Sequence, residues 1–228
     1  MTALRAWINE RLGWDKIWQA IFERRIPEAK GPVAWLYTLG SALLFVFLVQ
    51  IITGALLGMN YVPSPDHAHD SIRYIENEVL LGKFIRGLHH WGATLMVILV
   101  FLHMLRVYFM AAYKYPREAT WLFGVGRFLV VMGLGFTGYL LPWDQKAYWA
   151  TVVGVNIAGQ APVVGPYVAK VLMGGDAMGA ATLTRFYALH VLVLPLTAAL
   201  LIGVHLFLVI WHGISEVPRR VGKGERVL

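Results

Sequence analysis

Four histidines lie in two stretches apolar enough to cross a membrane. His89 and His103 are fourteen residues apart in one stretch, and His190 and His205 are fifteen apart in the other. An α-helix turns by about 100° and rises by about 1.5 Å per residue. After fourteen or fifteen residues the side-chain direction is therefore within about 40–60° of the starting direction, about 21–22 Å further along the axis. The spacing therefore places two histidines of each stretch on one face, at two depths.

Paired imidazoles at one depth could bind a haem iron from both sides. An ionisable side chain in the membrane usually faces the bundle interior and serves a function, and haem iron takes histidine in helical bundles. We therefore predict two stacked sites, one formed by His89 with His190 and the other by His103 with His205. A lone membrane histidine could be a hydrogen-bonded packing residue, but four that match in depth favour the haem interpretation.

Glycines repeat the same spacing on two other apolar stretches. Gly40 and Gly54 are fourteen residues apart, as are Gly124 and Gly138. A flat macrocycle held between two helices presents its edges to the other two, and a glycine lets the ring approach the backbone. Glycine is also a common packing residue in membrane helices, but two pairs that match the histidine step support the haem sites.

Arginines flank the histidine stretches. Arg86 lies three residues before His89, Arg106 three after His103, and Arg185 precedes the second stretch. Each could donate a charge-assisted hydrogen bond to a haem propionate. The alternative is that the arginine side chains extend to the membrane interface and set the topology of the chain. This alternative accounts for Arg185 more readily than for Arg86 and Arg106.

The remaining histidines are predicted not to be ligands. His90 is turned by about 100° from His89 on the same helix, so it cannot share the ligand face. His67 and His69 lie in a polar connection, and His212 lies where the last apolar stretch ends. We expect these four to be solvated or interfacial.

Composition indicates an integral membrane protein. The chain has 228 residues, of which 58% are hydrophobic and 14% charged, far from the balance of a soluble domain. It has no cysteine, which excludes disulfides, thiolate metal sites, iron–sulfur ligation and covalent thioether haem. The net charge of +7 is interpreted as membrane topology and not as nucleic-acid binding.

Four segments satisfy the requirement of about 20 apolar residues for a membrane span. They cover residues 34–59, 88–111, 121–141 and 186–211. The predicted fold is an all-α four-helix membrane bundle over residues 33–215, with two haems in its core. Residues 1–32, which include RAWINERLGWDKIWQAIFERR, predict an amphipathic helix in the membrane interface and its lead-in, and residues 216–228 form a basic tail.

Lysine and arginine set the orientation. They are concentrated in the N-terminal arm, in the connection after the second span and in the tail. This distribution predicts that both termini are cytoplasmic. The membrane expected is a bacterial inner membrane. The connection 142–185 is long and apolar. Within it, PVVGPYVAKVLMGG predicts a short helix on the membrane surface.

Several stretches resemble the N-terminal, haem-bearing part of cytochrome b of cytochrome bc complexes, most closely the split cytochrome b6-type form. These stretches are FLVQIITG, IRGLHHW, LHMLRVY, PREATW, FTGYLLPWDQKAYWA and TLTRFYALHVLVLPL. The likeness covers roughly residues 5–215, and the fifteen-residue histidine step also resembles the b6 form.

The resemblance implies two non-covalent, bis-histidine b-type haems. His89 and His190 would hold the haem on the positive side of the membrane, and His103 and His205 the haem on the negative side. Quinol would be oxidised near the positive side, with one electron passing to a Rieske iron–sulfur protein. The other would cross both haems to reduce quinone near the negative side, coupled to proton translocation.

The complex implied is a quinol:cytochrome c (or plastocyanin-type acceptor) oxidoreductase. Part of its quinol pocket would be formed by residues 138–153, with a wall consisting of Tyr139, Pro142, Trp143, Tyr148 and Trp149. The implied partners are a Rieske protein, a c-type cytochrome, lipid, a second copy in a homodimeric complex and a three-helix subunit that completes the quinol site.

The chain departs from the family pattern at three places. The proline-glutamate-tryptophan-tyrosine element of the quinol site is absent, as expected if the three-helix subunit carries it. Thr38 stands where cytochrome b6 has a cysteine that tethers a third haem, so no covalent third haem is expected. Ile210 and Trp211 replace a basic pair, and no residues are assigned to the negative-side quinone site.

The sequence leaves two alternatives to a cytochrome bc subunit. One is the dihaem membrane anchor of a quinone-linked dehydrogenase or hydrogenase, against which the long apolar connection with PWDQ and the glycine pairs argue. The other is a transporter or structural bundle whose histidines relay protons, which predicts no light-absorbing cofactor.

Overall fold

The computed structural model describes residues 3–15, 18–19, 31 and 33–215, and within these it is helical without strands. Helix α1 (Ala3–Leu12) covers the first part of the predicted interfacial helix. The rest of that prediction falls largely outside the described residues, as does the predicted basic tail at 216–228. A short α3 (Val33–Leu36) precedes the first span.

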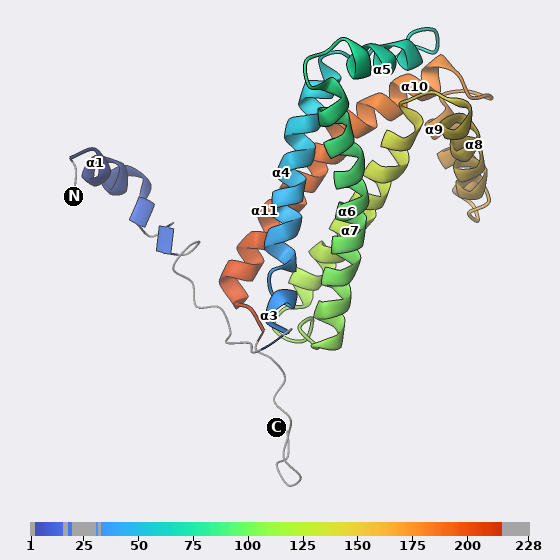
Figure 1. The fold of residues 1–228 in the computed structure, drawn as a ribbon. Helices are drawn as coiled ribbons and strands as arrows, with labels where there is room; N and C mark the ends of the chain where they lie inside the picture. The colour runs from blue at the N-terminus through green and yellow to red at the C-terminus, as the bar shows by residue number, and fades with distance from the viewer. Residues whose placement is uncertain (1–2, 16–17, 20–30, 32, 216–228) are drawn as a thin grey trace.

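Four helices are long and apolar enough to cross a membrane, which confirms the four predicted spans. They are α4 (Leu39–Gly58), α6 (Gly82–Phe109), α7 (Glu118–Leu140) and the continuous run of α10 (Ala180–Ala188), η1 (Leu189–Val193) and α11 (Leu194–His212). Figure 1 shows them side by side as one bundle. Helices α6 and α10 begin six residues before the predicted starts at 88 and 186.

Three shorter helices gather at one end of the bundle, here called the α5 end (Figure 1). They are α5 (Ala68–Asn77), α8 (Gln145–Gly159) and α9 (Gly165–Met173). Helix α9 confirms the short helix predicted in the apolar connection. Helix α5 was predicted as a polar loop, but its polar residues alternate with Ala68, Ser71 and Ile75, which are buried on one face.

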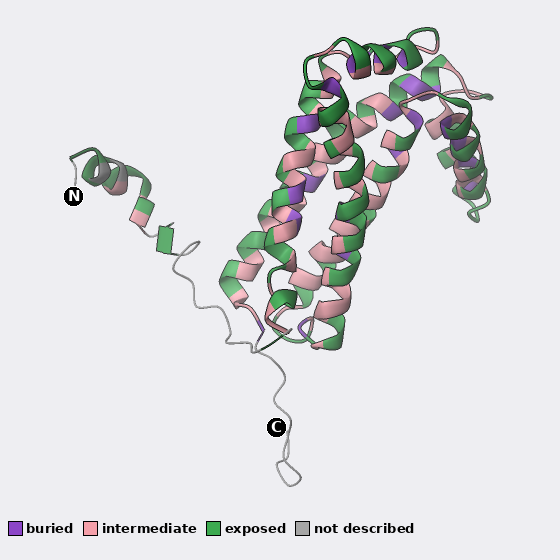
Figure 2. Ribbon diagram, viewed as in Figure 1, coloured by how far each residue is buried: buried purple, intermediate pink, exposed green. Residues whose placement is uncertain are grey.

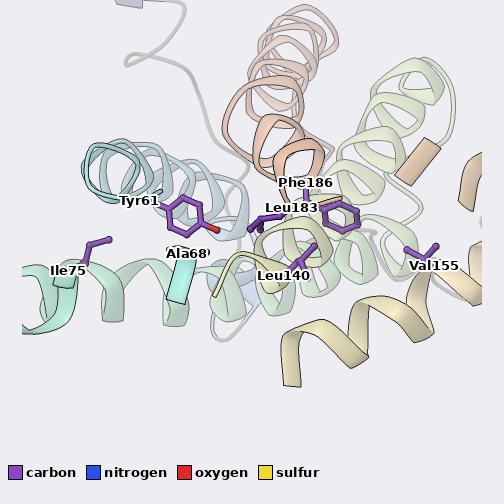
Figure 3. Close-up of a cluster of buried hydrophobic side chains, with 7 residues drawn as sticks. All are labelled: Tyr61, Ala68, Ile75, Leu140, Val155, Leu183 and Phe186. Carbon is purple, nitrogen blue, oxygen red and sulfur yellow. The ribbon is translucent and has the colours of Figure 1, made fainter. Parts of the chain in front are cut away.

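A cluster of buried side chains holds these helices to the spans (Figure 3). Its members are Tyr61, Ala68, Ile75, Leu140, Val155, Leu183 and Phe186. The Tyr61 hydroxyl donates to the Leu141 carbonyl at 2.6 Å. Burial, reinforced by Tyr187, raises the pKa of Tyr61, so the hydroxyl stays protonated and keeps this bond. Phe186 and Leu183 are fully buried in this cluster, so the end is closely packed.

Burial along the spans is sparse outside this end (Figure 2). Helix α4 packs closely on α6, and α7 packs on α11. Leu43, Val46, Met96 and Val100 form a buried cluster between α4 and α6, at mid-height. On α7 the buried residues are Thr137 and Leu140, both near the α5 end. A bundle filled by its own side chains buries a stripe on every helix, and these spans do not.

A π turn at Leu189–Val193 carries His190 and interrupts the last span. A π turn has i→i+5 hydrogen bonds and takes up one more residue than an α turn. The fifteen residues from His190 to His205 therefore cover about the rotation of fourteen in regular helix, within about 40° of one face. The predicted alignment of His190 and His205 on one face is therefore improved by this single turn.

Candidate functional site

His89 on α6 and His190 on η1 face each other near the α5 end of the bundle. Their ring centroids are 6.1 Å apart with the planes at 75°. Metal–imidazole bonds are about 2 Å long, so two such bonds in line, with half a ring on either side, span about 6 Å. The separation fits one metal ion between the two rings.

Hydrogen bonds at Nδ1 orient both rings. The Thr53 hydroxyl donates to the Val49 carbonyl at 2.6 Å, which leaves its oxygen to accept from Nδ1 of His89 at 2.9 Å. On the other side, Nδ1 of His190 lies 3.0 Å from the Leu134 carbonyl, which can only accept. A proton fixed on Nδ1 leaves the Nε2 lone pair free for a metal, the arrangement found in metal-binding histidines.

His103 on α6 and His205 on α11 form the second pair, at the opposite end of the bundle. Nδ1 of His205 donates to the Thr120 carbonyl at 3.1 Å, so its Nε2 is free as well. Nδ1 of His103 is buried without a hydrogen-bond partner among the described residues. Nε2 of each ring is then the nitrogen that a metal would bind.

Each predicted glycine lies directly against one of the four histidines. A methyl group built on Gly138 would lie 2.5 Å from Cε1 of His190, and one on Gly54 would lie 3.1 Å from Cε1 of His89. At the opposite end, a methyl group built on Gly40 would lie 3.5 Å from Cε1 of His103, and one on Gly124 would lie 3.5 Å from Cε1 of His205. Gly138 and Gly54 therefore make room for the imidazoles themselves, whereas 3.5 Å at Gly40 and Gly124 is an ordinary van der Waals distance.

The three predicted arginines differ in their surroundings. Arg106 stacks on the ring of Tyr37 at 4.1 Å, and its Nε and Nη2 are buried without partners. Arg86 is paired with Glu76, and Arg185 is exposed and donates to the Val171 carbonyl. Arg106 is thus the one of the three whose buried nitrogens are unsatisfied.

The residues of the predicted quinol wall are only partly brought together. A half-open cavity of about 210 Å³ is lined by Trp143, Asp144, Gln145, Tyr148 and Trp149. Tyr139 and Pro142, which the sequence grouped with them, do not line it. Trp143 has a positive φ of 52°, an uncommon conformation for a bulky residue, and Asp144 caps α8 by accepting from the Ala147 N–H at 2.8 Å.

The other histidines lie away from the two pairs. His90 is exposed, with its ring against Trp91. His67 and His69 are exposed at the α5 end, and His69 contacts the Pro142 carbonyl through Nδ1 at 3.3 Å. In the part of the chain that the structure describes, no three His, Cys, Asp or Glu side chains converge as a metal cluster.

Sequence reasoning missed Thr53, Thr137 and Arg127. The first two precede Gly54 and Gly138, so a repeated Thr-Gly pair on two spans was a readable signal. Thr137 lies 3.2 Å from Nδ1 of His190. Arg127 lies in the middle of α7 and was not singled out because it has no counterpart on another span.

Comparison with known proteins gives a consistent result. Residues 27–213 match the family described as Cytochrome b/b6/petB. The chain is 45% identical over 221 residues to the menaquinol:cytochrome c reductase cytochrome b subunit of Geobacillus thermodenitrificans, covering 94% of this chain and 98% of that protein. It is 44% identical over 211 residues to cytochrome b6 of Heliobacterium mobile, covering 92% of this chain and 98% of that protein.

A solved structure shares the fold. It is a chain of a hyperthermophilic respiratory Complex III, with a TM-score of 0.82 and 33% sequence identity. The match covers 92% of this chain and 56% of that one, so this chain spans a little over half its length.

Proposed function

Because the chain belongs to the cytochrome b/b6 family, we propose that it is the dihaem b-type cytochrome subunit of a quinol:cytochrome c oxidoreductase. It carries electrons across the membrane from a quinol oxidation site at the α5 end, the positive side, to a quinone reduction site at the opposite end, with proton translocation. The observation that carries the proposal is the facing pair His89 and His190, whose ring centroids are 6.1 Å apart. His103 and His205 form a second histidine pair on the same two spans.

The residues fit two b-type haems. His89 and His190 would hold the positive-side haem, with Thr53 and the Leu134 carbonyl fixing their tautomers. His103 and His205 would hold the negative-side haem, with the Thr120 carbonyl fixing the tautomer of His205. When bound, each haem iron accepts and releases one electron. Gly138 and Gly54 allow the His190 and His89 rings to lie against the helix backbones, and the apolar spans exclude water.

Arg106 is the best-supported propionate partner, because its Nε and Nη2 are buried and unsatisfied. A hydrogen bond to a charged group contributes about 1.5–3 kcal/mol. We expect Arg106→Met to weaken retention of the negative-side haem roughly tenfold to hundredfold, measured as haem loss to a haem-binding acceptor protein. Arg185→Met is the control, since Arg185 is exposed and bonded to a backbone carbonyl. Equal haem loss in both variants would contradict the assignment.

Trp143, Tyr148 and Trp149 form this chain's part of the quinol oxidation site. Their cavity of about 210 Å³ is smaller than the 300–1,000 Å³ of typical ligand pockets. This fits a site completed by a separate three-helix subunit. Menaquinol is the first substrate to test, because it is named for two relatives that are each 45% identical.

The proposed assembly follows the family. Partners are the three-helix subunit, a Rieske iron–sulfur protein, a c-type cytochrome and lipid, in a homodimeric complex of a bacterial inner membrane with both termini cytoplasmic. Thr38, whose hydroxyl donates to the Trp35 carbonyl at 2.8 Å, offers no thiol to tether a third haem. The names of the relatives favour this complex over the anchor of a dehydrogenase or hydrogenase, and over a proton-relay transporter.

The functional proposal is tested by purifying the complex in mild detergent through a tag on this chain. We expect a Rieske protein, a c-type cytochrome and a three-helix membrane subunit to copurify, and the preparation to reduce cytochrome c with menaquinol. A flavin- or metal-containing dehydrogenase in their place, without quinol:cytochrome c activity, would support the anchor and reject the proposal.

A further inference from the structure

Arg127 is a charged residue in the middle of a membrane span. It lies nine residues after Glu118 and thirteen before Leu140, the ends of α7. Across the four described spans, every other Asp, Glu, Lys or Arg lies within about two turns of a helix end. A charge at the centre of a membrane helix costs about 2.5–3.5 kcal/mol or more and is commonly functional.

Arg127 lies on the face of α7 that is turned toward the bundle interior. Thr120, Gly124, Arg127 and Val131 follow steps of four, three and four residues, which place them on one face. The Thr120 carbonyl accepts from His205, Gly124 lies against the His205 ring, and Val131 packs on the cluster between α4 and α6. Arg127 is partly buried on this face, one helical turn from Gly124.

No carboxylate neutralises this charge in the described part of the chain. The ion pairs found there involve Arg11, Arg86 and Lys170. The acidic residue of α7 is Glu118, nine residues away at the helix start, which is about 13 Å along the axis. An unpaired cation inside the bundle therefore contributes a fixed positive field.

The depth of Arg127 makes this field selective. It lies three residues from Gly124, about 4.5 Å along the axis, and eleven from Gly138, about 16 Å along the axis. Since Coulomb energy falls with distance, the charge acts much more strongly on the His103–His205 site than on the His89–His190 site. Along the axis, Arg127 lies on the side of the His103–His205 site that faces the His89–His190 site.

We propose that Arg127 raises the reduction potential of the haem held by His103 and His205, so that the transmembrane electron step runs downhill. This inference rests on the proposed function. An iron(III) porphyrin with two neutral imidazoles carries a net charge of +1, and the iron(II) form carries none. A nearby cation disfavours the +1 form and so favours one-electron reduction at this site, the electron being given up by a haem held by His89 and His190.

The test is a redox titration of the purified, haem-loaded protein, followed by visible absorption. We compare the wild type with Arg127→Met, Arg127→Gln, Arg127→Lys and Leu129→Met, the last being a control on the lipid-exposed face of α7. The transition that is absent from His103→Ala identifies the negative-side haem. In the two neutral variants its reduction equilibrium constant should fall about tenfold, which is about 59 mV for one electron.

The other two variants are controls. Arg127→Lys should keep the reduction potential of the negative-side haem close to its wild-type value, and Leu129→Met should leave it unchanged. The inference is overturned if the neutral variants leave this potential unchanged, if they shift the His89–His190 haem instead, or if Arg127→Lys behaves like Arg127→Met. If Arg127→Met loses haem, Arg127→Gln decides, because it keeps a polar side chain without charge. A wild-type protein without b-type transitions would reject the proposed function itself, which is a separate result.

Discussion

Replacement of His103 by alanine is expected to remove the haem at the end opposite α5 and to leave the other in place. The purified variant should carry about one b-type haem per chain, because the altered site would keep only one of the two histidines that would hold the haem iron. The His89–His190 pair lies on other turns of the same helices, with its own Thr53 and Leu134 contacts. Haem content and the dithionite-reduced spectrum measure the loss.

His90→Ala is the matched control for this experiment. His90 lies on the same helix, but it is exposed and contacts Trp91, so its removal should leave haem content unchanged. If His90→Ala removes a haem, or if His103→Ala retains both, the assignment of ligands on α6 is wrong.

Gly138→Ala is expected to abolish the other site, although it adds a single methyl group. The new Cβ would lie 2.5 Å from Cε1 of His190 and 3.0 Å from its Nδ1, closer than van der Waals contact allows. The imidazole must move, which breaks the bond of Nδ1 to the Leu134 carbonyl at 3.0 Å. We expect about half the haem content, with the His103–His205 haem retained, in the same spectral assay.

Gly135→Ala provides the control within the same helix. A methyl group at Gly135 would meet nothing within 4 Å, and alanine is a better helix former by about 1 kcal/mol. This variant should bind both haems. Full haem occupancy in Gly138→Ala would show that the close contact between glycine and imidazole is not needed for the site.

The spans and the histidine pairing could be predicted from the sequence because both follow from helix geometry. Twenty apolar residues predict a span whatever surrounds it, and steps of fourteen residues predict alignment on one face. The π turn at Leu189–Val193 could not be predicted, since it depends on how the last span packs. Helix α5 was missed because its polar residues resemble a loop until Ala68 and Ile75 are seen to be buried.

The surroundings of the charged residues were equally hidden. Arg86 and Arg106 flank their histidines symmetrically in the sequence, yet one is paired with Glu76 and the other has unsatisfied buried nitrogens. That difference depends on α5, which brings Glu76 over the start of α6. Tyr139 and Pro142 were grouped with Trp143 through the family resemblance, but they are not among the residues that line the cavity.

The central claim is that two histidine pairs hold two haems in this chain, and haem stoichiometry tests it most directly. The pyridine haemochrome spectrum of the purified protein gives the type and amount of haem, and quantitative amino-acid analysis gives the amount of chain. We expect b-type haem at about two per chain, in line with two bis-histidine sites. A colourless protein, or one saturated at one haem per chain, would contradict it.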